Sequence, residues 1–319
     1  MVNNVVVPLP RLPAMPRSPR SARLLSSAAA LLLAAAAFAF AAAGRAATPP
    51  PTFTADIVYG EAAGQKLLLD ASVPAGPGPF PVAILVHGGG WRRGDKARSP
   101  KPDDNADISP WFETLNEAKF TWFSINYRHA PAHRWPACYE DVLTAIRWVK
   151  AHAADYKGDP ARIALFGHSA GGHLVCLAGT RPEADTRVAA IVGFAAVTDM
   201  VPLPNAKAIS NNYTNLFGIQ PAITPDSVAI LRAASPLHQV KPGLPPFLLL
   251  HGEDDPGVPI GQAQALREKL RAAGNTCDLF TIRAGTHPLA QWDDVDPGYR
   301  GRLVAWLRRT LGKPGDPKP

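Results

Sequence analysis

The chain has 319 residues, of which 46% are apolar and 18% are charged. This apolar content can build one sizeable core, and it excludes an intrinsically disordered protein. The formal net charge is +7. Five arginines and no acidic residue lie in residues 1–46, which leaves 28 basic and 26 acidic residues in the rest of the chain. Because no basic stripe with interleaved aromatic residues occurs, nucleic acid is not an expected partner.

Residues 1–46 have the composition of an export signal. Residues 1–23 are rich in proline and arginine, residues 24–43 are almost wholly apolar, and small residues follow. This order predicts a secretory signal peptide, cleaved after Ala46 or Ala43, and a periplasmic or secreted protein. Two alternatives stay open. About 20 apolar residues can span a bilayer, so the segment could be an uncleaved inner-membrane anchor, or it could be an upstream extension with the true start at Met15.

Strand-like and helix-like stretches alternate through the expected catalytic domain, residues 47–311, which a flexible tail of residues 312–319 follows. The apolar runs and alternating patterns predict strands at residues 53–59, 66–73, 80–86, 120–127, 162–166, 188–197, 247–250 and 277–282. The first two strands are expected to form an antiparallel pair. Helical spacing of apolar residues predicts helices at residues 139–154, 170–178, 259–273 and 299–311. The alternation indicates an α/β fold with a mostly parallel sheet and helices on both faces.

Two polar stretches interrupt this alternation and are expected to border a pocket. Residues 97–109 are polar and contain proline, and residues 200–237 are loop-like, with a short helix expected near residues 226–233.

A glycine-rich stretch, Gly167-His168-Ser169-Ala170-Gly171, lies between an expected strand and an expected helix. A serine on a sharp strand-to-helix turn projects its hydroxyl above the sheet edge, and glycines flank it because the turn leaves no room for side chains. The pattern in this context predicts Ser169 as a nucleophile. The alternative is a glycine-rich turn with an idle serine.

A second motif, His87-Gly88-Gly89-Gly90-Trp91, directly follows the expected strand at residues 80–86. Acyl transfer places negative charge on a carbonyl oxygen, which preorganised N–H donors must stabilise. We therefore expect an oxyanion hole formed by Gly88, Gly89 and Gly90 together with the N–H of Ala170. Which glycine donates stays open at this point. His87 and Trp91 are expected to brace the loop, and the alternative is a simple strand-end turn.

Three acidic residues, Glu253, Asp254 and Asp255, follow the expected strand at residues 247–250. A carboxylate at this end of the sheet can orient a catalytic histidine. We favour Asp255 because of its position before Val258-Pro259.

His287 is the only one of the nine histidines that follows Asp255 in the chain. It lies in a loop after an expected strand, and the order serine, acid, histidine suits one known arrangement of a catalytic triad. His287 is thus the expected general base. Of the others, His168 is expected to point away from the nucleophile, His173 lies on the helix behind it, and His251 is expected to be structural.

Residues 87–91, 126–131, 167–173, 234–237 and 251–259 together resemble the α/β-hydrolase esterase group, which includes hormone-sensitive-lipase-like carboxylesterases and bacterial acetyl-xylan and feruloyl esterase-like proteins. The resemblance covers roughly residues 57–311. It implies a three-layer α/β/α sandwich, a Ser169–Asp255–His287 triad and no cofactor or metal. It also implies scaffold roles for Arg128 and Asp141.

The expected function is that of a serine carboxylesterase that hydrolyses short-chain acyl esters, with acetylated or feruloylated carbohydrate as a candidate small-molecule substrate. Two alternatives stay open: an arylformamidase that resembles kynurenine formamidase, and a non-catalytic binding protein on a hydrolase fold. The cysteines Cys138, Cys176 and Cys277 are too few and too scattered for a disulfide framework or a zinc site, and we expect them to be buried as small apolar side chains. The sequence leaves the oligomeric state open.

Overall fold

The computed structural model describes residues 49–101 and 103–312. The chain divides into two units, Met1–Pro49 and Pro50–Pro319, and the description below concerns the second. The predicted signal segment, residues 1–46, and most of the predicted tail lie outside the described residues. In the part that is described, no helix has the length and apolar character needed to cross a bilayer.

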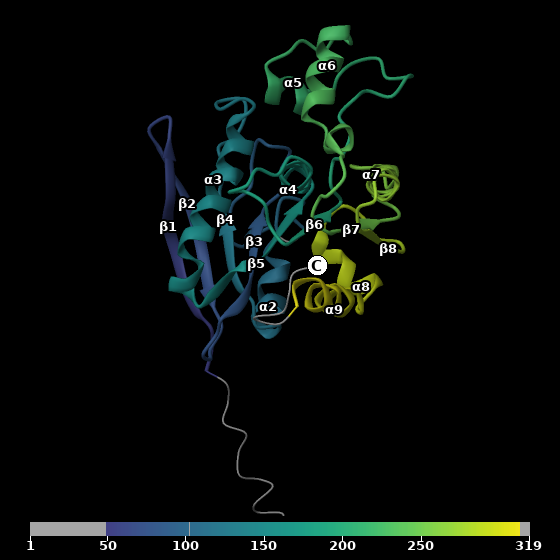
Figure 1. Cartoon of the computed structure of the whole chain (residues 1–319). Coiled ribbons are helices and arrows are strands. Elements are labelled where there is room, and N and C mark those ends of the chain that lie inside the picture. Colours follow the sequence, from purple (N-terminus) through teal and green to yellow (C-terminus); the bar gives the residue numbers. More distant parts are fainter. Residues whose placement is uncertain (1–48, 102, 313–319) are drawn as a thin grey trace, which may run out of the picture. The chain divides into compact units, whose positions relative to one another are not determined.

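An eight-stranded, mostly parallel sheet forms the centre of this unit, in the order β1-β2-β4-β3-β5-β6-β7-β8 (Figure 1). Only β2 runs antiparallel to its neighbours, β1 and β4, within the described sheet. The strands are β1 Thr52–Ala62, β2 Gln65–Val73, β3 Phe80–Val86, β4 Thr121–Ile125, β5 Gly158–His168, β6 Ala190–Phe194, β7 Phe247–Gly252 and β8 Cys277–Ile282. All eight predicted strands are thereby confirmed, with ends that differ by a few residues.

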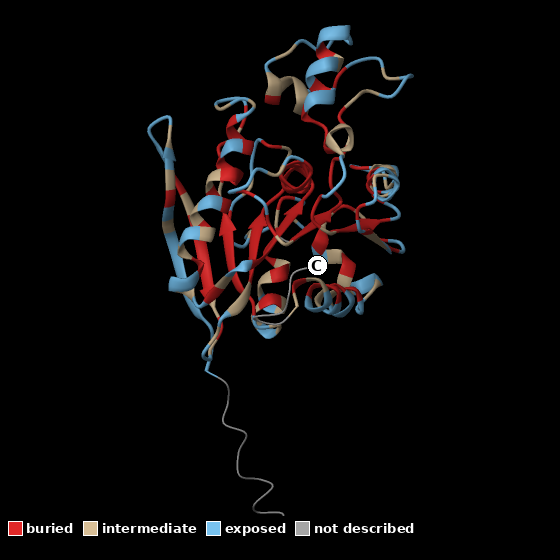
Figure 2. Cartoon of the chain, viewed as in Figure 1, coloured by how far each residue is buried: buried red, intermediate tan, exposed pale blue. Residues whose placement is uncertain are grey.

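The helices lie in two layers because each central strand sends alternate side chains to opposite faces. In β3, Val82, Ile84 and Val86 join one apolar cluster, whereas Ala83 and Leu85 join the other. The first cluster includes buried residues of α3 Ala137–His152, α4 Ala170–Thr180 and α7 Gly261–Ala272. The second includes those of α2 Pro110–Glu117, α8 Trp292–Val295 and α9 Tyr299–Leu311. The central strands are therefore buried on both faces, whereas the edge strand β1 is largely exposed (Figure 2). The continuous apolar runs predicted this burial of the central strands.

The polar insertion between β6 and β7 carries two helices, α5 Asn211–Phe217 and α6 Pro225–Ala234. Figure 1 shows both beyond the ends toward which the parallel strands run. The helix predicted near residues 226–233 is thus confirmed as α6, which begins with a capping box between Thr224 and Ser227. Three short 3₁₀ helices complete the described elements: η1 Ala153–Tyr156, η2 Pro236–Gln239 and η3 Leu289–Gln291.

Candidate active site

Ser169 occupies a strained turn between β5 and α4. Its φ of 54° and ψ of −115° lie where non-glycine residues are rarely found. The flanking glycines make this turn sterically feasible. A Cβ at Gly167 would lie 2.3 Å from the carbonyl oxygen of Gly171, and a Cβ at Gly171 would lie 2.2 Å from that of Val86. The glycine-serine-glycine spacing is therefore required by close backbone packing at the end of the sheet.

The structure brings Ser169, His287 and Asp255 into one hydrogen-bonded chain. The Ser169 hydroxyl lies 2.9 Å from Nε2 of His287, and Nδ1 of His287 lies 2.7 Å from Oδ2 of Asp255. All three residues are buried although they come from three different loops at the carboxyl ends of β5, β7 and β8. The arrangement lets the serine donate to a histidine whose other nitrogen donates to a carboxylate.

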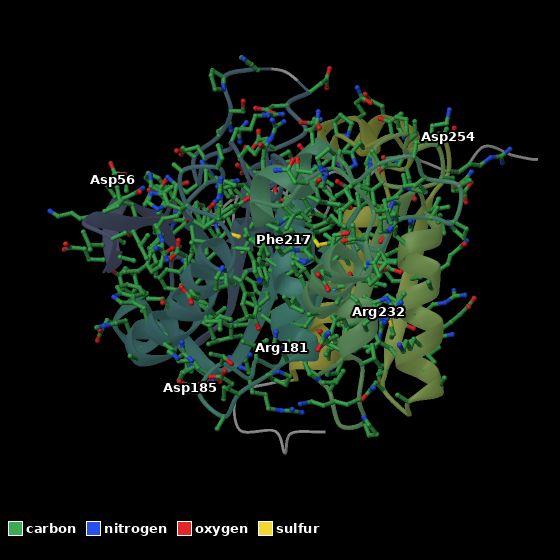
Figure 3. The ribbon with its side chains drawn as sticks, turned by 90° about the horizontal axis from the view of Figure 1, so that it is seen from above. Asp56, Arg181, Asp185, Phe217, Arg232 and Asp254 are labelled. Carbon is green, nitrogen blue, oxygen red and sulfur yellow. The ribbon has the colours of Figure 1, made fainter. Side chains whose placement is uncertain are left out.

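Asp255 is held as an ionised carboxylate. Burial alone would raise its pKa, but hydrogen bonds from His287 and from the backbone N–H of Val258 and Gly257 outweigh burial and hold the pKa below its usual value. The two backbone donors lie 2.9 and 2.8 Å from Oδ1. The competing acids, Glu253 and Asp254, are exposed, and Figure 3 labels Asp254 near the margin of the view.

Two of the three glycines in the loop after β3 line the site. The N–H of Gly88 donates to the carbonyl of Ala106 at 2.7 Å, so it is occupied within the protein. Gly89 and Gly90, with φ of 98° and 62°, line a cavity of about 290 Å³ together with Ser169 and Ala170. Ala170 opens helix α4, where the first N–H groups have no partner within the helix. The structure thus narrows the glycine donors to Gly89 and Gly90.

Buried side chains brace this loop, as predicted for His87 and Trp91. The Trp91 indole N–H donates to Nδ1 of His173 at 3.2 Å, and Nε2 of His173 donates to the carbonyl of Ala234 in α6 at 2.8 Å. The His87 ring stacks on Tyr127 with ring centroids 4.4 Å apart, and the Tyr127 hydroxyl donates to the carbonyl of Gly88 at 3.0 Å. The loop is therefore fixed to β4, α4 and the insertion at once.

The side chain of His168 contacts the loop that carries His287. Its Nε2 donates to the backbone carbonyl of His287 at 2.9 Å, and the two rings lie 4.9 Å apart. Burial and the adjacent His287 lower the pKa of His168 to about 3, so the ring is neutral. It supports the histidine loop from the nucleophile turn. No sequence signal marks this contact, because it joins residues 119 positions apart.

Other predicted structural roles are confirmed. Nε2 of His251 donates to the carbonyl of Val258 at 2.7 Å, which steadies the acid loop. Arg128 and Asp141 form a buried bidentate pair, with Nη2 and Oδ1 2.7 Å apart. The three cysteines are buried and free.

Both polar insertions border the cavity, as expected. The first supplies Asn105, and the second supplies Ser210, Asn212 and Tyr213. Across the described residues, no group of three or more histidine, cysteine, aspartate or glutamate side chains is placed to hold a metal ion.

Comparisons with known proteins agree with this architecture. A family model described as BD-FAE matches residues 69–270. Two curated relatives from Mycobacterium tuberculosis are 35% identical: Esterase LipQ, over 79% of this chain and 60% of the relative, and the probable carboxylic ester hydrolase LipM, over 68% and 51%. The chain thus spans only about half to three fifths of their lengths.

A solved structure, the truncated form of a carbohydrate esterase from gut microbiota, is 25% identical and superposes with a TM-score of 0.69. The superposition covers 85% of this chain and all of the other. Since the family model matches well over half of its residues, the chain belongs to the BD-FAE family of α/β-hydrolases.

Proposed function

We propose that the protein is a serine carboxylesterase that cleaves short-chain acyl esters through an acyl-enzyme. The observation that carries the proposal is the continuous hydrogen-bonded chain from Ser169 through His287 to Asp255. The names of the relatives LipQ and LipM, an esterase and a probable carboxylic ester hydrolase, support it.

In the first step, the Ser169 hydroxyl attacks the ester carbonyl while Nε2 of His287 accepts its proton. Asp255 stabilises the resulting imidazolium and keeps Nδ1 protonated. The carbonyl oxygen becomes negative and accepts hydrogen bonds from the N–H groups of Ala170 and of Gly89 or Gly90. These donors belong to braced backbone, so little reorganisation is needed as charge develops.

In the second step, the tetrahedral intermediate collapses, and His287 gives its proton to the departing alcohol. A water molecule then attacks the acyl-serine with His287 again as the base, which releases the acid and restores the Ser169 hydroxyl. No cofactor enters this scheme.

The proposed substrate is an ester with a small acyl group on a polar alcohol. The cavity of about 290 Å³ is at the small end of ligand sites, and Asn105, Ser210 and Asn212 give it hydrogen-bonding groups. An acetyl ester of a carbohydrate is the candidate we favour, and the gut carbohydrate esterase with the same fold supports this choice.

The test is hydrolysis of p-nitrophenyl esters from acetate to palmitate by the purified protein and its Ser169→Ala variant. We expect acetate to be cleaved fastest and the variant to lose several orders of magnitude in turnover with its fold intact. Labelling of Ser169 by a fluorophosphonate gives an independent readout. If Ser169 is labelled but no ester is cleaved, formamides become the proposed substrates. If Ser169 is not labelled, the protein is a binding protein on a hydrolase fold.

We further propose that the protein is exported by residues 1–46, whose basic, apolar and small-residue regions support a cleaved signal. Fractionation of cells that express the full chain, with N-terminal sequencing of the product, tests this. A new N-terminus at Gly44 or Ala47 is expected, and an intact N-terminus in the membrane fraction would indicate an anchor.

A further inference from the structure

The cavity around Ser169 has a one-sided charge. Two arginines, Arg92 and Arg93, are among its lining residues, and no aspartate or glutamate is. The acid of the triad, Asp255, lies behind His287 and is buried. Among the residues that the structure describes, the cavity lining therefore contains arginine and no carboxylate.

The two arginines differ in their partners. Arg93 is neutralised by Asp104, with Nη1 and Oδ1 2.7 Å apart, and it also donates to Asn105. Arg92 is exposed, and its side chain forms no hydrogen bond or ion pair with any residue that the structure describes. Only Arg92 thus brings an uncompensated positive charge to the cavity.

The backbone holds Arg92 at a fixed position relative to the reacting atoms. Its N–H donates to the carbonyl of Gly89 at 3.2 Å, and the preceding Trp91 is buried and anchored to His173. The backbone of Arg92 is therefore fixed two residues after Gly90, while its side chain, which has no partner among the described residues, can extend into the cavity.

A neutral donor lies close to the same loop. The side-chain amide nitrogen of Asn212 would be 3.2 Å from a Cβ at Gly90, and this side chain has no hydrogen-bond partner in the described part of the chain. Asn212 can add a hydrogen bond to an anionic oxygen that Arg92 attracts.

The positive charge is local to this site. Outside residues 1–46 the chain carries 28 basic and 26 acidic residues, so the molecule as a whole supplies little attraction for anions. A preference for a charged substrate would have to arise at Arg92.

We propose that the natural ester carries a negatively charged group, a carboxylate in the simplest case, which binds Arg92 while the ester carbonyl lies at Ser169. The inference rests on the proposed esterase function and narrows its substrate class. Two positions fit the chemistry, on the acyl part or on the alcohol part, and the experiment separates them.

The test uses ester pairs that differ in charge. On the acyl side, the 4-nitrophenyl monoester of glutaric acid is compared with 4-nitrophenyl valerate. On the alcohol side, 4-acetoxybenzoate is compared with its methyl ester. The ratio of kcat/KM for the charged ester to that for the neutral ester is measured for the wild-type protein and for Arg92→Gln. Arg98→Gln is the matched control, because it removes an exposed charge nearby that does not line the cavity.

In one of the two pairs, we expect Arg92→Gln to lower the ratio about fivefold, mainly through KM of the charged ester, because a partly hydrated ion pair contributes mostly to binding. Arg98→Gln should change the ratio less than twofold. The wild-type preference should shrink as salt is raised, since an exposed pair is screened. An unchanged ratio in both pairs, or an equal loss in Arg98→Gln, would overturn the proposal.

Calorimetric binding of the same four esters to the Ser169→Ala variant, with and without Arg92→Gln, separates this inference from the esterase assignment. Tighter, Arg92-dependent binding of a charged ester supports the inference even if the wild-type protein cleaves none of them. Turnover of neutral esters without charge discrimination leaves the esterase assignment standing and overturns the inference alone.

Discussion

Asp255 acts on the reaction through the histidine that it orients. Its Oδ2 accepts a hydrogen bond from Nδ1 of His287, and its Oδ1 accepts hydrogen bonds from two backbone N–H groups. An asparagine at this position keeps the shape but can turn an N–H toward His287, which favours the wrong tautomer.

We therefore expect Asp255→Asn to lower kcat by about four orders of magnitude. Steady-state kinetics with p-nitrophenyl acetate measures this. Circular dichroism of the variant should match the wild type, and a loss below tenfold would mean that Asp255 does not orient the base.

At the residue scale, sequence reasoning selected side chains that the structure brings together. Ser169, Asp255 and His287 were accessible to prediction because each lies in a loop after a recognisable strand. Two contacts could not be predicted: the hydrogen bond from the Gly88 N–H to Ala106 and the hydrogen bond from His168 to His287. Their partners lie in distant loops, and no local sequence pattern determines the path of those loops.

At the element scale, two glycines near helix N-termini have opposite requirements. Gly171 in α4 packs against the backbone of β3, whereas a Cβ at Gly301 in α9 would meet no atom within 4 Å. At Gly301 no close contact requires a glycine, so the glycine there only lowers the helix propensity of α9.

Gly301→Ala should raise the free energy of unfolding by about 0.5–1 kcal/mol, with esterase activity unchanged. Gly171→Ala should abolish activity and lower stability, because its Cβ would overlap the Val86 carbonyl. Urea unfolding and ester hydrolysis of both variants test the pair. A destabilised Gly301→Ala would show that the start of α9 is constrained in a way its open surroundings do not indicate.

The Arg128–Asp141 pair joins the loop after β4 to helix α3. Asp141 is 1% exposed and also accepts from the backbone N–H of Arg128 at 2.8 Å. Removing Asp141 leaves the buried Arg128 with only a longer ion pair to the exposed Glu140, at 3.8 Å.

Asp141→Ala is expected to lower the free energy of unfolding by about 3–5 kcal/mol. The double variant Arg128→Met/Asp141→Leu should lose less, since neither charge remains. Urea unfolding of the three proteins measures both effects. An equal loss in the double variant would assign the cost to packing and not to the unpaired charge.

The predicted elements were those with strong periodicity. The buried parallel strands are continuous apolar runs, and the antiparallel β1 and β2 show alternating patterns, so all eight strands were recognised. The helices α2, α5 and α8 were not predicted, because they have only 8, 7 and 4 residues, which is too short for a helical repeat to stand out in the sequence. Tertiary packing, such as that of Trp111 and Trp292 in the second core cluster, stabilises such short helices.

At the scale of the whole molecule, buried neutral histidines make stability depend on pH. Burial lowers the pKa of His87 and His173 to about 4 and that of His168 to about 3. In the unfolded chain these rings bind protons near pH 6.5. Their contribution to stability is therefore fully present above pH 6.5 and is lost as the pH falls toward 4 and 3.

These three rings should lower the free energy of unfolding by roughly 4 kcal/mol between pH 7.5 and 5.5, because the unfolded state then binds up to about three more protons on them than the folded state. Burial also lowers the pKa of His129 and His251, which acts in the same direction. Urea unfolding across this range measures the slope. In His173→Gln the slope should be shallower by the share of about one proton, whatever the variant's absolute stability. A pH-independent stability would mean that these rings are protonated in the folded protein.

The three cysteine thiols are buried and free, which affects how the protein can be produced and labelled. Burial raises the pKa of Cys138 and Cys277 to about 12, and that of Cys176 further still, so each sulfur is a poor nucleophile while the protein is folded. Because the three cysteines are free and no disulfide bond has to form, the protein can be expressed in a reducing cytoplasm without catalysts of disulfide formation. The rate at which a thiol-labelling reagent modifies each cysteine then measures how often the structure around that cysteine opens.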